Sequence, residues 1–151
     1  MNSIPTVTKN LLIINVLCFF GGVVAMKYGI DLNDLLGLHF FMASDFNPAQ
    51  LITYMFMHAG ILHILFNMLW LYWFGSLFLY FFSAKHLRGL YVLGGICGGL
   101  LYMVAYNVFP LFSSQVAGAT LVGASASVLA IVAATAYREP NYRVQLFLFG
   151  A

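Results

Sequence analysis

The chain has 151 residues, of which 63% are hydrophobic and only 7% carry a charge. A soluble domain has about 25% charged residues, so this composition excludes a soluble globular domain. The net charge of +2 is too small to indicate a nucleic-acid partner, and we expect none. The sequence therefore predicts an integral membrane protein, all-α in fold class, with the lipid bilayer as its surroundings.

Hydrophobic runs divide the chain into membrane-spanning segments. A spanning helix needs about 20 apolar residues, and four runs reach or approach this length, at 10–28, 51–82, 87–109 and 122–137. A further apolar run begins at residue 144 and is cut off at residue 151. We therefore expect a polytopic helical bundle of about four spans plus the start of a fifth. It forms a single domain over residues 1–151 that is incomplete at its C-terminus.

Basic residues predict the orientation of the bundle. If the four spans alternate in direction, five of the six basic residues fall on one side: Lys9, Lys85, Arg88, Arg138 and Arg143. Lys27 falls on the other side, together with the three aspartates. Because cytoplasmic loops carry the excess of Lys and Arg, the N-terminus is expected in the cytoplasm.

Three polar side chains interrupt the second apolar run, at His58, His63 and Asn67. Ionisable groups at membrane depth are costly and indicate a functional site. His63 and Asn67 are four residues apart, so a helix places them on one face, where their N–H donors could hold a developing oxyanion. An ordinary interhelical hydrogen-bond pair is the alternative interpretation. His58 and His63 suit shared metal binding poorly, being about 140° apart on a helix, and we expect no metal site.

The fourth run opens with the small residues Gly123-Ala124-Ser125-Ala126, which leave room for a substrate backbone beside the serine. The alternative is a serine that bonds to the carbonyl four residues back. Ser127 lies about 200° round the helix from Ser125 and cannot share its site. His86, in the basic turn, and His39, in an outer-loop amphipathic element expected to rest at the interface, are not placed to act as a base for Ser125.

Glycines in the third run predict close helix packing. Gly94 and Gly98 form one small-xxx-small pattern, and Gly95 and Gly99 form another that overlaps it. Such patterns let a helix backbone approach its neighbour closely.

At this point the residues resemble a known family. The segment from Gln50 to Leu69, with His58, His63 and Asn67, resembles the second transmembrane helix of the rhomboid intramembrane serine proteases. The Gly123–Ala126 segment is similar to their Gly-x-Ser-x nucleophile motif. Residues 87–95 and 8–16 resemble their third and first helices, so the resemblance covers essentially the whole chain.

The resemblance implies a six-helix core in which a short fourth helix starts from a loop that dips into the protein. It implies Ser125 as the nucleophile, with His63, Asn67 and the Ser125 amide as the oxyanion hole. His58, Gly123 and Ala124 would line the site. The implied activity is endopeptidase cleavage of transmembrane protein substrates without a cofactor, in the plasma membrane of a bacterium.

Three features depart from the family pattern. The base histidine, in an Ala-His-x-x-Gly motif on the sixth helix, has no counterpart here. Family members usually have an aromatic residue four positions after the serine, and Leu129 stands there in this chain. Residues 35–48 lack the Trp-Arg pair that many members carry in the first outer loop. We therefore expect an endopeptidase fragment that is inactive as it stands, with its base beyond this chain. The alternative is a non-catalytic rhomboid-like membrane protein that binds transmembrane clients. A small transporter ranks third, because no inverted repeat is evident.

Overall fold

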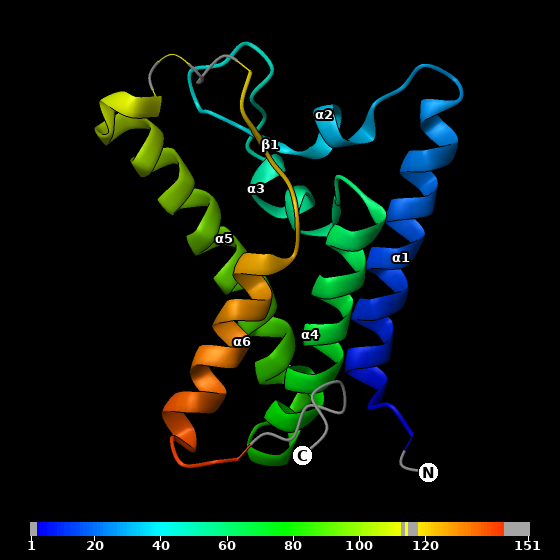
Figure 1. Cartoon of the computed structure of the whole chain (residues 1–151), viewed down its shortest axis with the longest axis vertical. Coiled ribbons are helices and arrows are strands. Elements are labelled where there is room, and N and C mark those ends of the chain that lie inside the picture. Colours follow the sequence, from blue (N-terminus) through cyan, green and yellow to red (C-terminus); the bar gives the residue numbers. More distant parts are fainter. Residues whose placement is uncertain (1–2, 113, 115–117, 144–151) are drawn as a thin grey trace.

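The computed structural model describes residues 3–112, 114 and 118–143, and within them the fold is almost entirely helical (Figure 1). Three helices are long and apolar enough to cross a membrane: α1 (Thr6–Met26), α4 (Ile61–Phe81) and α5 (Ala84–Val108). They overlap three of the four predicted runs. The predicted start of a fifth span, at 144–151, lies outside the described residues.

Local sequence explains the two ends of α5. Ser83 caps its N-terminus, where the side-chain oxygen accepts a hydrogen bond from the His86 N–H. This capping satisfies a backbone donor that has no partner within the helix. The helix ends at Val108, and Phe109, the residue before Pro110, has extended backbone. A residue before proline is disfavoured in the helical conformation, so the helix ends there.

The prediction of one continuous span over 51–82 is wrong. The run divides into α3 (Gln50–Thr53), a 3-10 turn (η1, Tyr54–Phe56), an irregular segment at 57–60 and then α4. The backbone is extended at Met57 (φ −93°, ψ 140°) and again at Gly60 (φ −163°, ψ 170°). His58 therefore lies before α4 rather than on it, and its predicted helical angle to His63 does not apply.

The fourth predicted span, 122–137, also differs from expectation. Helix α6 runs from Ser125 to Arg138, and its 14 residues span about 21 Å, less than the roughly 30 Å of a bilayer core. Figure 1 shows the extended segment before it descending from one end of the bundle, so that α6 begins about midway along the other helices. This is the short helix after a dipping loop that the resemblance implied.

A two-stranded antiparallel sheet fixes the start of that descending segment. Strand β1 (Leu38–His39) pairs with β2 (Thr120–Leu121), with Leu38 opposite Leu121 and His39 opposite Thr120. The sheet joins the long connection after α1, which includes the short helix α2 (Leu32–Leu36), to the segment that leads into α6. A 3-10 turn, η2 (Pro110–Phe112), follows α5.

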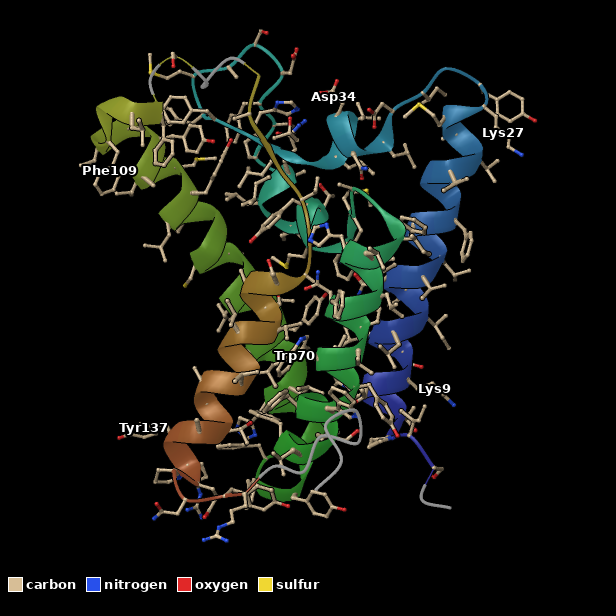
Figure 2. The ribbon with its side chains drawn as sticks, in the orientation of Figure 1. Lys9, Lys27, Asp34, Trp70, Phe109 and Tyr137 are labelled. Carbon is tan, nitrogen blue, oxygen red and sulfur yellow. The ribbon has the colours of Figure 1, made fainter. Side chains whose placement is uncertain are left out.

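Basic residues gather at one end of the bundle, as the positive-inside pattern predicts. Figure 2 places Lys9 and Tyr137 at one end and Lys27, Asp34 and Phe109 at the other. The start of α5, which carries Lys85 and Arg88, lies at the same end as Lys9 (Figures 1 and 2). The grouping of the basic residues is therefore consistent with four alternating segments. Which end faces the cytoplasm stays a prediction.

One pair of glycines on α5 sets its contact with α6. A Cβ on Gly94 would overlap the Cβ of Ala130, and a Cβ on Gly98 would overlap that of Ala126. Helices α5 and α6 form the most extensive helix pair of the described fold, and α6 also packs on α4. The predicted close approach through Gly94 and Gly98 is confirmed.

The second pair faces other elements. A Cβ on Gly95 would overlap the side chain of Met55 in η1, and one on Gly99 would lie 2.9 Å from Leu38 in β1 and 3.1 Å from Leu51 in α3. The two overlapping patterns thus serve two different faces of one helix.

We predict that Gly98→Ala lowers the stability of the bundle, because the added methyl group overlaps Ala126 and forces α5 away from α6. The expected cost is about 1–3 kcal/mol, as for other overpacked core sites. Gly89→Ala is the matched control, because it lies on the same helix with open space where its Cβ would be. It should leave stability unchanged or raise it by roughly 0.5–1 kcal/mol, since alanine favours a helix over glycine. Thermal unfolding of both variants in the same detergent compares them, and equal melting temperatures would contradict the packing described.

Candidate functional site

The structure brings Gly123, Ser125 and His63 together. Gly123 has a positive φ of 121°, and a Cβ at this position would lie 2.8 Å from both Cε1 and Nε2 of His63. The same Cβ position is 3.9 Å from the Oγ of Ser125. The His63 imidazole therefore lies directly against Gly123, and the Ser125 hydroxyl approaches the same glycine. Only glycine combines the required backbone conformation with this close approach.

Two backbone hydrogen bonds hold the turn that leads into Ser125. The Gly123 N–H donates to the carbonyl oxygen of Tyr54 at 3.0 Å. The Ala124 N–H donates to Nε2 of His58 at 3.4 Å, and Ala124 is fully buried. Helix α6 then begins at Ser125, with the Val128 N–H bonded to the Ala124 carbonyl at 2.9 Å. The 3-10 turn η1 and the irregular segment at 57–60 therefore position the serine.

The two histidines of the site contact each other edge to face, with ring centroids 5.0 Å apart and planes at 66°. His58 is only 3% exposed. His63 accepts a hydrogen bond at Nδ1 from the Ala59 N–H at 3.4 Å. The irregular segment before α4 thus fixes both rings, one from within the segment and the other from the first turn of the helix.

Asn67 is buried one turn further along α4. Its Nδ2 donates to the His63 carbonyl at 2.9 Å, four residues back on the same helix. This bond uses one of the two amide N–H donors of the side chain and leaves the other. Within the described residues no hydrogen bond joins Asn67 to the Gly123–Ser125 turn, so the bond that holds its side chain is the one to the His63 carbonyl.

The two serines at the start of α6 lie on opposite faces, as predicted. Ser127 is fully buried and donates from Oγ to the Tyr91 carbonyl at 2.6 Å. Ser125 is exposed on the surface of the described bundle. Ser127 is a packing residue bonded to α5, and Ser125 is the serine with a free face.

The remaining histidines lie elsewhere. The interpretation of His39 as an interfacial side chain is wrong, because the pairing of β1 with β2 buries it to 4% exposure. Its Nε2 lies 2.6 Å from the Asp34 carbonyl oxygen. His86 is exposed, and its Nδ1 lies 2.7 Å from the Ser83 Oγ at the α4–α5 turn.

Sequence reasoning missed Gln50 as an organising residue of the long connection after α1. Its buried side chain makes four hydrogen bonds. The Oε1 atom accepts from the backbone N–H groups of His39 and Asn47, at 3.3 and 3.1 Å. The Nε2 atom donates to the carbonyls of Leu35 and Asp45, at 3.2 and 2.9 Å. The signal was a lone amide at the very edge of an apolar run.

Tyr54 was missed as well. Its hydroxyl donates to the Gly95 carbonyl on α5, and its own carbonyl accepts from Gly123. Tyr54 is 1% exposed, and it therefore joins η1, α5 and the Gly123–Ser125 turn, which we call the serine turn. A tyrosine in an apolar run gives no sequence signal for this role, because aromatic residues are common in such runs.

The described residues contain no group of three His, Cys, Asp or Glu side chains arranged to hold a metal ion. The polar groups of the site are instead N–H donors, ring nitrogens and a hydroxyl. This donor set suits acyl-transfer chemistry.

Comparison with known proteins identifies a family for this chain. The family model of the Rhomboid domain matches residues 46–151, which is more than half of the chain and includes the site residues. No curated protein and no solved structure matched the chain. The matched region begins just before α3 and contains the broken second segment, α5 and the short helix α6. The chain is therefore an integral membrane protein that belongs to the rhomboid family.

Proposed function

We propose that this chain carries the nucleophile and the oxyanion hole of an intramembrane serine endopeptidase. One observation supports the proposal above all others: the His63 ring lies against Gly123, the glycine that the Ser125 hydroxyl also approaches. A serine at the start of a helix, with a histidine donor packed against the preceding turn, suits acyl transfer. The family consists in general of serine intramembrane proteases, which agrees with this chemistry.

Ser125 is the proposed nucleophile. Its position at the first residue of α6 places its own N–H among the helix amides that have no partner within the helix. The positive end of the helix dipole also lies there and favours negative charge that develops nearby. Attack by Oγ on a substrate carbonyl would therefore place the new oxyanion close to these amides.

His63 and Asn67 are the proposed side-chain donors to that oxyanion. Because Nδ1 of His63 accepts from Ala59, the proton of the neutral ring lies on Nε2, the atom next to Gly123. Asn67 keeps one amide N–H after its bond to the His63 carbonyl. In this proposal Nε2 of His63, the free amide N–H of Asn67 and the Ser125 N–H stabilise the tetrahedral intermediate together.

A serine nucleophile also needs a base that takes its proton. His39 and His86 are engaged away from the site, and each ring at the site has a nitrogen occupied by a backbone N–H. We therefore propose that a histidine outside this sequence supplies the base. It would accept the Oγ proton as the ester bond forms and give it to the amine as the peptide C–N bond breaks. Water would then hydrolyse the acyl-enzyme and release the carboxylate product.

The proposed substrates are transmembrane helices with a locally unwound segment. The serine lies about midway along the bundle, and the extended segment before it runs toward the end that carries Lys27 and Asp34 (Figures 1 and 2). A substrate must present a carbonyl at that depth, which a continuous helix cannot do because its carbonyls are hydrogen-bonded internally. A rhomboid-like protein that only binds such helices remains the competing function, and the first experiment below separates the two.

In the full-length protein, Ser125→Ala should abolish cleavage of a transmembrane reporter in proteoliposomes, because it removes the proposed nucleophile. Ser127→Ala is the matched control: it removes the bond to Tyr91 on the opposite face of α6. It should lower the melting temperature and keep the rate per folded molecule within about twofold. Equal rates for wild type and Ser125→Ala, or no cleavage by any version, would favour the client-binding protein.

Asn67→Ala should lower the cleavage rate of the full-length protein and leave the KM for substrate nearly unchanged. A donor to the oxyanion acts mainly in the transition state, and the loss of one such donor costs roughly 10²–10³ in rate. His63 and the backbone amide share the charge, so the lower end is expected. Rates are normalised to folded enzyme, and the melting temperature is measured on the same samples. A lower melting temperature with an unchanged normalised rate would make Asn67 a packing residue.

A further inference from the structure

His58 lies beside the turn that leads into Ser125. It belongs to the irregular segment between η1 and α4 and is only 3% exposed. Its Nε2 is 3.4 Å from the backbone nitrogen of Ala124, which donates its N–H. A backbone N–H cannot accept, so Nε2 must carry a lone pair and no proton.

This bond determines where the proton of His58 lies. An imidazolium has protons on both nitrogens and could not accept the Ala124 N–H, so the ring is neutral. Its single proton must then lie on Nδ1. That atom is buried and has no hydrogen-bond partner of normal geometry among the described residues. His58 therefore carries its proton on Nδ1 and uses its other nitrogen to bind the turn that leads into Ser125.

His63 has the opposite arrangement. Its Nδ1 accepts from the Ala59 N–H, so its proton lies on Nε2, the atom closest to Gly123. Two adjacent rings in edge-to-face contact thus carry their protons on different nitrogens. One ring presents an acceptor to the turn, and the other presents a donor.

We propose that His58 is a positioning residue, whose unprotonated Nε2 holds the Ala124 amide and thereby keeps Ser125 beside the N–H donor of His63. The expected effect of His58 on the cleavage rate rests on the proposed function, whereas the tautomers of His58 and His63 do not depend on it. The turn has a second anchor in the Gly123–Tyr54 bond, but that bond lies one residue further from the serine. Loss of the His58 bond would free the peptide next to Ser125 and leave a buried N–H without a partner, which proteins rarely tolerate.

The first test is nitrogen NMR of the full-length protein, labelled with ¹⁵N at histidine and alanine, in nanodiscs. Nε2 of His58 should show the signal of an unprotonated ring nitrogen and Nδ1 that of a protonated one, with the reverse pattern for His63. A coupling across the hydrogen bond should join the Ala124 nitrogen to Nε2 of His58. His39 is the internal reference, because a carbonyl oxygen lies 2.6 Å from its Nε2 and requires a proton there. A protonated Nε2 on His58 would overturn the proposal.

The second test compares two substitutions in the full-length protein. His58→Gln can place its Oε1 near the former Nε2 position and accept the Ala124 N–H, whereas His58→Phe fills similar space without an acceptor. We expect His58→Phe to lower kcat by about tenfold with KM unchanged, the order expected for one lost hydrogen bond. His58→Gln should recover most of that loss.

Equal kcat for the two variants would show that the acceptor is not needed and would overturn the positioning role. If His58→Phe fails to fold, the NMR pattern of the wild-type protein decides alone. Failure of the proposed function gives a different result: Ser125→Ala would then match wild type in the cleavage assay, while the tautomers of His58 and His63 would keep the pattern given above.

Discussion

The rest of this structure depends on how closely other elements approach α5. Gly94 and Gly98 let α6 lie against one face, where any side chain would overlap Ala130 or Ala126. Gly95 and Gly99 admit Met55 and Leu38 on another face. In a membrane, where lipid tails are as apolar as leucine, such close packing is a principal source of helix association. The position of α6, and therefore of Ser125, follows from the lack of a side chain at Gly94 and Gly98 on α5.

Buried hydrogen bonds determine which faces of the packed helices meet. Tyr91 on α5 is 1% exposed, and its hydroxyl accepts from Asn15 of α1 at 3.0 Å and donates to the Met55 carbonyl at 3.2 Å. Its backbone carbonyl accepts from Ser127 of α6. One residue thus joins α1, η1 and α6 to α5. Because unsatisfied polar groups cost several kcal/mol in hydrocarbon, these bonds fix which faces of the helices meet. Tyr54 does the same for the serine turn.

Hydropathy predicted α1, α4 and α5 well, because span length and apolar composition are what a bilayer selects. It failed at 57–60, where Met57 and Ala59 are as apolar as the helix that follows and only Gly60 marks a change of backbone. Hydropathy also failed at 122–124, because it does not distinguish the start of an apolar helix from a buried extended segment. The positions of Gln50, Tyr54 and His39 depend on contacts between segments far apart in the chain, and a single sequence does not record those contacts. The sequence did single out the segments around His63 and Ser125, which the structure brings together at Gly123, because histidine and asparagine are unusual at membrane depth.

The most direct test of this account is the structure of the full-length protein after reaction with a fluorophosphonate. The account predicts phosphorus bonded to Oγ of Ser125, with a phosphoryl oxygen, which stands in for the oxyanion, within hydrogen-bond distance of Nε2 of His63. A site that lacked this donor would leave the phosphoryl oxygen directed elsewhere. An unmodified Ser125, or an adduct whose phosphoryl oxygen points away from His63, would contradict the claim that the close approach at Gly123 builds a catalytic site.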